Sequence, residues 1–136
     1  MSSHDAYLTF TVAGRRCAVA GSRVIEVLRL EEAAGFSLFD LARFFGAEAS
    51  RTAPRQCVIV VTAGERVMGL VADEATDVIS LSAADFVSVP SFGPRITIPY
   101  LSALARTGDV LSLVLDMDQL LTAAHIEAFS TGEVPA

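Results

Sequence analysis

The 136-residue sequence contains no lysine and no tryptophan, and it has only two cysteines and two histidines. Charged residues make up 19% of the chain, and the formal net charge is −6. An acidic surface argues against contact with a phosphate backbone, because such contact requires a cationic face. We therefore expect that nucleic acid is not a partner.

Long hydrophobic runs are also absent. No stretch approaches the roughly 18–20 apolar residues that span a bilayer. The polar start, MSSHDAYLTF, has no basic segment of the kind that opens a signal peptide. We expect a cytoplasmic protein without direct membrane insertion. Cys17 and Cys57 each begin a strand-like run, which favours two buried, reduced thiols over a disulfide.

The sequence lacks the groupings that carry catalysis. Neither His4 nor His125 has a cysteine, histidine or carboxylate at metal-ligand spacing. No glycine-rich phosphate loop, G-x-S-x-G or H-E-x-x-H motif occurs. The acidic group Asp73-Glu74-Asp77 lies on a connecting segment, where such groups are usually solvated. We expect no catalytic residue, no metal and no cofactor, and the 52% hydrophobic content favours exposed apolar surface that binds a partner.

One part of the chain is nearly repeated. Residues 12–30 read VAGRRCAVAGSRVIEVLRL, and residues 62–81 read TAGERVMGLVADEATDVISL. An offset of 50 aligns Ala13-Gly14 with Ala63-Gly64, and one inserted residue later Glu26-Val27-Leu28 aligns with Asp77-Val78-Ile79. Each copy predicts a β-hairpin with a glycine in its turn, followed by a further β-branched strand.

A second repeat follows the first. SLFDLARFF (37–45) matches LVLDMDQLL (113–121) at an offset of 76, which pairs Asp40 with Asp116. Each segment predicts a strand that stops at an aspartate, and that aspartate caps a short helix.

The two halves differ in length between these repeats. Glu26 and Asp40 are 14 positions apart, whereas Asp77 and Asp116 are 39 positions apart. The longer half holds a proline-rich loop, a predicted strand at about 98–105 and a predicted turn at 107–109. A strand and its loop are therefore missing from the shorter half.

These patterns predict one all-β domain over residues 1–136. Lobe one covers roughly 7–45, a polar linker covers 46–56, and lobe two covers roughly 57–121. A C-terminal helix and tail occupy 117–136, and we expect the tail to be frayed after Phe129.

The order YLTFTVAGRR…VIEVLRL…FDLARFFG…GLVADEATDVISL…LVLDMDQLL resembles the CheW-like domain of bacterial chemosensory systems, from Tyr7 to Leu121. The resemblance implies two small five-stranded β-barrels that are similar to SH3 domains. It also implies short helices after each lobe, strands exchanged between lobes, and here a first lobe that lacks one strand. CheW-like domains are non-enzymatic adaptors that couple chemoreceptor tips to a CheA-type histidine kinase.

The resemblance also implies a set of partner-binding residues. Three of them match the family's V-x-E-V/I motif, and the others match its G-[IL]-V-x-D…D-V run; together they are Val24, Glu26, Val27, Val71, Asp73, Asp77 and Val78. Glu26 is the best candidate, because an acidic residue in a β-branched stretch must face water or a partner. Alternation along a strand gives Val71 and Val78 even odds of burial.

The sequence departs from the family at the missing strand. The family has a proline-containing loop and a G-V-I-N-L-R-G strand there, and its arginine contacts a partner. We therefore expect binding to the cytoplasmic tip of a methyl-accepting chemoreceptor, weakened or lost binding to the regulatory domain of a CheA-type kinase, and self-association through an open β edge. Two alternatives stay open: a receptor-only protein that regulates or caps the array, and a small β-fold enzyme or ligand-binding domain.

Overall fold

The computed structural model describes residues 5–45, 56–87 and 100–133. Strands dominate the described part of the chain, as the all-β prediction requires. The strands are β1 (Asp5–Val12), β2 (Arg15–Ala20), β3 (Val24–Arg29), β4 (Ser37–Asp40), β5 (Cys57–Ala63), β6 (Arg66–Ala72), β7 (Glu74–Leu81), β8 (Phe86–Val87), β9 (Leu101–Thr107), β10 (Val110–Leu115) and β11 (Ser130–Glu133). The helices are α1 (Leu41–Phe44), α2 (Met117–Leu120) and α3 (Ala123–Phe129), with short 3-10 turns η1 (Gly21–Arg23), η2 (Leu30–Glu32) and η3 (Ala83–Asp85).

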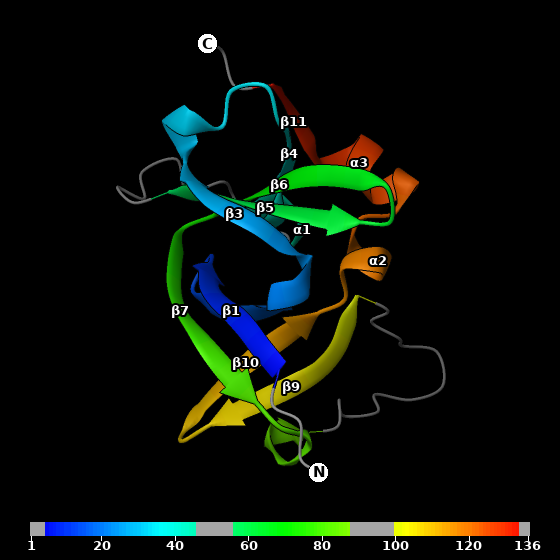
Figure 1. Cartoon of the computed structure of the whole chain (residues 1–136). Coiled ribbons are helices and arrows are strands. Elements are labelled where there is room, and N and C mark those ends of the chain that lie inside the picture. Colours follow the sequence, from blue (N-terminus) through cyan, green and yellow to red (C-terminus); the bar gives the residue numbers. More distant parts are fainter. Residues whose placement is uncertain (1–4, 46–55, 88–99, 134–136) are drawn as a thin grey trace.

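The strands form two sheets, which occupy the lower and upper halves of the molecule in Figure 1. Sheet A has the order β7-β1-β2-β10-β9-β8, and sheet B has the order β11-β4-β6-β5-β3. Residues 7–45 and residues 57–121 each contribute strands to both sheets. The chain crosses between the sheets after β2, after β6 and again between β10 and β11, so each sheet combines segments that are distant in sequence.

The internal repeat is present, but its offset is 51 throughout. Val12 pairs with Arg15 across the first turn, and Ala63 pairs with Arg66 across the second. The offset of 50 expected for the hairpins was wrong, because the glycines hold different turn positions. Gly14 is the second residue of its turn and Gly64 the first of its own, and both have positive φ, which glycine adopts readily.

The second repeat places two strands in matching positions. β4 lies parallel to β6, and β10 lies parallel to β2. Each strand ends at the predicted helix cap: the Asp40 carboxylate accepts from the Arg43 N–H, and the Asp116 carboxylate accepts from the N–H groups of Asp118 and Gln119. These caps satisfy helix N–H groups that have no partner within the helix.

The shorter half has no strand between β3 and β4, where the chain forms only the 3-10 turn η2. In sheet A the corresponding place, beside β10, belongs to β9. The strand expected at 98–105 is present as β9 from Leu101 onward, and positions 98 and 99 lie outside the described residues.

In sheet B the place of β9 is taken by β11. Both strands run antiparallel to their neighbour, and both have one irregular residue at the same step. The pairs Ser130↔Phe39, Gly132↔Leu38 and Glu133↔Ser37 correspond, residue by residue, to Leu101↔Leu115, Ala103↔Val114 and Leu104↔Leu113. The expectation of a frayed tail after Phe129 was therefore wrong for residues 130–133, since the strand position left empty by the deletion gives their backbone a pairing partner.

The core holds the two sheets together. Its largest cluster is built from both sheets and includes Phe10, Phe39 and Ile59, all fully buried. Each sheet adds a smaller cluster on its other side, around Leu81 in sheet A and around Val58 in sheet B. Because the large cluster is shared, the two sheets pack onto one common core.

The cysteines match the expectation of buried, reduced thiols. Cys17 and Cys57 are both free and buried within the shared cluster. Burial raises the pKa of the Cys17 thiol to about 12, against a smaller lowering by nearby Arg15. Burial also raises the pKa of the Cys57 thiol. Neither thiol is therefore activated as a nucleophile at neutral pH.

Candidate functional site

Two edge strands carry most of the candidate partner-binding residues. Among the strands that the structure describes, β3 ends sheet B and pairs only with β5, whereas β7 ends sheet A and pairs only with β1. The 51-residue offset makes the two strands equivalent, so that Glu26 corresponds to Asp77 and Val27 to Val78. An edge strand leaves one row of backbone N–H and C=O groups without a sheet partner, and such rows are available for intermolecular contact.

β3 presents apolar and acidic side chains together. Glu26 is exposed and forms no hydrogen bond or ion pair with any residue that the structure describes. Its neighbours Ile25 and Val27 are also exposed, at 53% and 43%. The pairing with β5 skips Ile25, and this irregularity sets neighbouring side chains outward where strict alternation would bury one of them.

Ile25 was missed by sequence reasoning. It is the residue between the motif's valine and glutamate, and alternation alone gives no reason to single it out. Its equivalent Thr76 is skipped in the same way in the pairing of β7 with β1, but the irregular step is visible only in the structure.

β7 is the more self-contained of the two edges. Val78 is 65% exposed, but its backbone N–H donates to the Asp77 carboxylate at 2.8 Å. The hydroxyl groups of Thr76 and Thr9 are hydrogen-bonded at 2.6 Å, which ties the irregular step of β7 to β1. The Asp77 carboxylate of β7 thus accepts a hydrogen bond from the backbone of its own strand. The equivalent Glu26 carboxylate of β3 forms no such bond with the described residues.

The remaining candidates point toward the interior or are engaged in the fold. Val24 is half-buried against the shared core, and Val71 is half-buried against the smaller cluster of sheet B. The Asp73 carboxylate accepts from the Ala13 N–H at 2.9 Å, and the Asp73 N–H donates to the Thr11 carbonyl at 2.9 Å. Asp73 therefore fastens the crossing from sheet B to sheet A onto the first hairpin.

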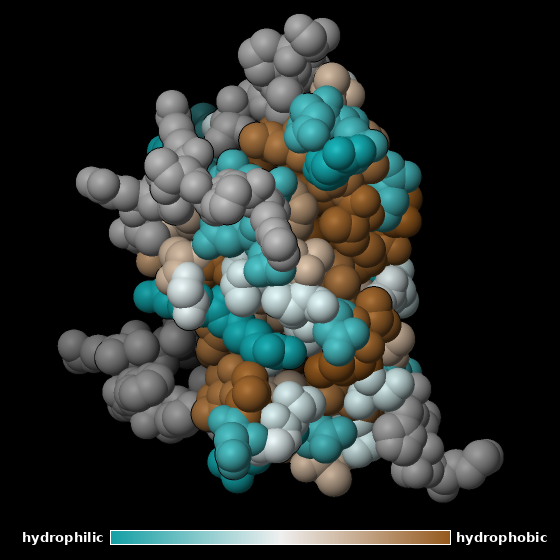
Figure 2. Space-filling model, turned by 90° about the vertical axis from the view of Figure 1, so that its left-hand side faces the viewer, coloured by the Kyte–Doolittle hydropathy of each residue, from teal (hydrophilic) through white to brown (hydrophobic). Residues whose placement is uncertain are grey.

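The candidate residues are divided between the two sheets. Glu26 and Val27 lie on sheet B, and Asp77 and Val78 lie on sheet A. Figure 2 views the molecule from the side on which β7 lies in Figure 1, and hydrophobic surface stands there next to hydrophilic residues. Such a mixed surface suits protein contacts better than the binding of a small polar ligand.

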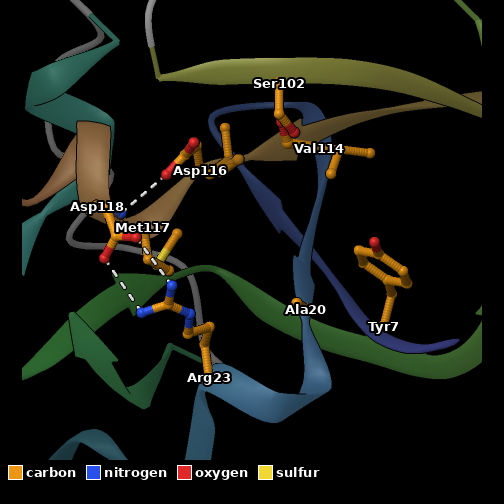
Figure 3. Close-up of a pocket in the computed structure, with 9 residues that line it drawn as sticks. Tyr7, Ala20, Arg23, Ser102, Val114, Asp116, Met117 and Asp118 are labelled. Atoms are coloured by element: carbon orange, nitrogen blue, oxygen red, sulfur yellow. Dashed lines mark hydrogen bonds and ion pairs between the residues drawn. The ribbon is translucent and has the colours of Figure 1, made fainter. Parts of the chain in front are cut away.

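A cleft of about 210 Å³ lies on sheet A, between the β1–β2 hairpin and the segment from β10 to α2. Figure 3 shows Arg23 reaching across one end of it, with Tyr7 on the other side. The Arg23 guanidinium donates to both carboxylate oxygens of Asp118, at 3.1 and 2.8 Å. The cation is therefore already paired, and the contact joins η1 to α2 across 95 positions of sequence, which no sequence pattern signals.

Reactive groups do not converge in the parts of the chain described. Within residues 5–45, 56–87 and 100–133, no three histidine, cysteine or acidic side chains are placed to hold a metal ion. His125 Nδ1 lies 2.8 Å from the Leu120 carbonyl oxygen, and its ring packs against Phe44. None of the described helices is long and apolar enough to cross a membrane. The exposed strand edges are the outstanding surface feature.

A family model described as the CheW-like domain matches residues 6–125. The chain belongs to the CheW-like family. Members of this family are non-enzymatic adaptors, which excludes the alternative of a small β-fold enzyme. The V-x-E-V residues 24–27 lie on β3 within the matched region.

Two similar proteins carry the CheW name. Chemotaxis protein CheW of Klebsiella aerogenes is 33% identical over 69 residues, which are 51% of this chain and 42% of that protein. The match thus spans less than half the length of this curated relative. The crystal structure of the scaffolding protein TtCheW from Thermoanaerobacter tengcongensis aligns with a TM-score of 0.68 at 17% identity, over 84% of this chain and 90% of that one. At this identity the structural match supports the fold.

Proposed function

We propose that this CheW-like chain is a cytoplasmic adaptor of a chemosensory system, and that it binds the cytoplasmic tip of a methyl-accepting chemoreceptor. The observation that carries the proposal is the open edge of β3. There the Glu26 carboxylate is exposed and without a partner among the described residues, between exposed Ile25 and Val27. An unpaired acidic group flanked by exposed apolar side chains can form contacts of both kinds with one partner.

The same reasoning separates contact residues from supporting ones. Glu26 and Val27 are assigned to the receptor contact, with Asp77 and Val78 as an equivalent but more self-contained pair on β7. Val24, Val71 and Asp73 are assigned to holding these strands in place, because their side chains pack or bond within the chain.

A weakened kinase contact is the second part of the proposal. The deletion between β3 and β4 removes a loop and an arginine that the family uses for partner contact. β11 supplies backbone pairing for β4, but it brings no loop into the space between β3 and β4. We expect the chain to bind the receptor tip clearly more tightly than the regulatory domain of a CheA-type kinase.

The test is a pair of binding measurements on purified proteins, by calorimetry or interferometry. The Glu26→Arg variant should bind the cognate receptor tip about tenfold more weakly, which corresponds to about 1.4 kcal/mol. Its melting temperature should match that of the original chain, because the side chain is exposed. Glu65→Arg is the matched control, since it makes the same charge change at an exposed hairpin turn.

Two outcomes would contradict the proposal. Unchanged receptor binding by the Glu26→Arg variant would remove β3 from the receptor contact. Equally tight binding of the original chain to receptor tip and kinase domain would mean that the deletion has no functional consequence.

A further inference from the structure

Exposed apolar surface is found on β6 as well as on β3. β5 lies between these two strands, and its Thr62 pairs with Val67 of β6. Val67 is 44% exposed, and Thr62 is half-buried. Both side chains lie on the face of sheet B that holds the smaller cluster, because a Cβ at Gly69, two positions from Val67, would meet the Val58 side chain of that cluster.

Ile25 turns toward the same face of sheet B. Its equivalent in sheet A is Thr76, and the hydroxyl groups of Thr76 and Thr9 are hydrogen-bonded at 2.6 Å. The 51-residue offset makes Val60 of β5 the equivalent of Thr9, and Val60 belongs to the smaller cluster of sheet B. The irregular step therefore turns Ile25 toward Val60. Because β5 separates their strands, Ile25 and Val67 lie about 10 Å apart, which is two spacings between neighbouring strands.

We call Ile25, Thr62 and Val67 the β3–β6 row, and sheet A does not repeat its apolar character. The equivalent residues of sheet A are all polar: Thr76, Thr11 and Arg16. The same backbone positions thus accept hydroxyl groups and a cation, so the fold itself does not require apolar side chains there. Exposed apolar side chains that packing does not require are typical of a surface that contacts a partner.

We infer that the partner of the β3 contact extends across sheet B and covers Val67. This inference rests on the proposed function, and the partner is therefore the chemoreceptor tip. Glu26 and Ile25 are consecutive on β3, so a surface that contacts the Glu26 carboxylate also meets Ile25. From Ile25 the row continues through Thr62 to Val67. The contacting surface of the receptor tip carries a basic group opposite Glu26 and apolar side chains over both ends of the row.

Charge at β3 favours this partner over a second copy of the chain. The chain has a formal net charge of −6, so two copies repel each other as they approach. A symmetric contact through the two β3 edges would also bring two Glu26 carboxylates together, and neither has a partner of opposite charge among the described residues. A receptor surface with a basic group removes this repulsion.

Two valines of similar exposure allow a matched test. Val67→Ser removes apolar surface from the row, and Val110→Ser removes a similar amount from sheet A, where Val110 is 40% exposed. Titration calorimetry at several temperatures measures binding of each variant to the purified cognate receptor tip. The Val67→Ser variant should bind about fivefold more weakly, with a less negative heat-capacity change, because less apolar surface is buried. The Val110→Ser variant should bind as the original chain does.

Val67→Thr separates a lost contact from a lost fold, because threonine keeps the branched shape and the strand propensity of valine. This variant should bind about threefold more weakly, since a hydroxyl replaces a methyl group in the contact. Its melting temperature should be unchanged, because the side chain is exposed.

Equal binding by the Val67→Ser and Val110→Ser variants, whether both are weakened or neither is, would overturn the inference. The Glu26→Arg variant tells this failure apart from failure of the proposed function. If Glu26→Arg weakens receptor binding and Val67→Ser does not, the contact ends at β3 and the adaptor proposal stands. If neither variant weakens binding, the adaptor proposal is overturned as well.

Discussion

β9 and β11 occupy the same place in two similar sheets, yet they reach it by different routes. β9 has seven residues and is joined to β10 by a tight turn. β11 has four residues and follows α3 in the chain. The pairing partners and the irregular step are nevertheless equivalent. The comparison teaches that the register of the neighbouring strand, rather than chain connectivity, defines this position.

The same comparison explains how a shortened half remains folded. Loss of the strand after β3 leaves one side of β4 without hydrogen-bond partners, beside the buried Leu38 and Phe39. Unpaired backbone groups next to buried side chains are costly. β11 removes most of that cost, so the deletion need not destroy sheet B.

The largest predicted effect concerns a position where the two sheets differ in side-chain size. In the parallel pairing of β4 with β6 in sheet B, β6 has Gly69. The equivalent residue of β2, in its parallel pairing with β10 in sheet A, is Ala18. A Cβ at Gly69 would lie 2.5 Å from Val58 Cγ1 and 2.9 Å from Leu38 Cδ2. Gly69→Ala should therefore lower the free energy of unfolding by about 2–3 kcal/mol, measured by urea titration.

The reverse exchange in sheet A is the control for that variant. Ala18→Gly removes a buried methyl group without a clash and should cost about 1 kcal/mol. Equal losses of unfolding free energy for the two variants would mean that sheet B is no more closely packed at the β4–β6 pairing than sheet A is at the β10–β2 pairing.

A smaller effect is expected where the chain crosses between the sheets. Asp73 accepts from the Ala13 N–H, whereas its equivalent in the first crossing is Ser22, an exposed residue. Asp73→Ala should lower the free energy of unfolding by about 1–2 kcal/mol, because it removes a partly buried, charged hydrogen-bond acceptor. Ser22→Ala should change it by less than about 0.5 kcal/mol. Chemical denaturation of both variants compares the two crossings, and similar values would contradict the asymmetry.

The smallest effect is expected at the surface ion pair of sheet A. The Arg23 and Asp118 side chains are 37% and 54% exposed, so water and salt screen their attraction. Arg23→Gln should lower the free energy of unfolding by about 0.5 kcal/mol at low ionic strength and by less at high salt. Arg66→Gln at an exposed position of β6 serves as the control. A large loss that is independent of salt would show that the pair is essential to the fold.

Local signals made much of this architecture predictable from the sequence. The hairpin turns depend on glycine, and the helix caps depend on Asp40 and Asp116, so both can be read from neighbouring residues. The offset of the hairpin repeat was one residue short, because alignment of the two glycines hides their different turn positions. The exchange of strands between the two halves was expected from the family resemblance and not from the residues themselves.

β11 and the exposed Ile25 were not predictable in the same way. Ser-Thr-Gly-Glu has weak strand propensity, and it pairs only because the deletion elsewhere leaves β4 without its usual neighbour. Ile25 is exposed because of an irregular step in the pairing with β5, which depends on a strand about 35 residues away in the sequence. Among the candidate site residues, sequence reasoning correctly gave Glu26 an exposed position, but it could not separate Asp73 from the exposed group.

Hydrogen exchange in a chain that ends at Phe129 tests most directly whether β11 serves sheet B as β9 serves sheet A. Mass spectrometry would compare peptides covering β4 and β10 in this chain, in the full chain, and in a control chain that ends at Glu133. The account predicts exchange about tenfold faster in β4 when β11 is absent, with β10 and the control unchanged, because only β4 loses its neighbour. Protection of β4 equal to that in the full chain would contradict the account.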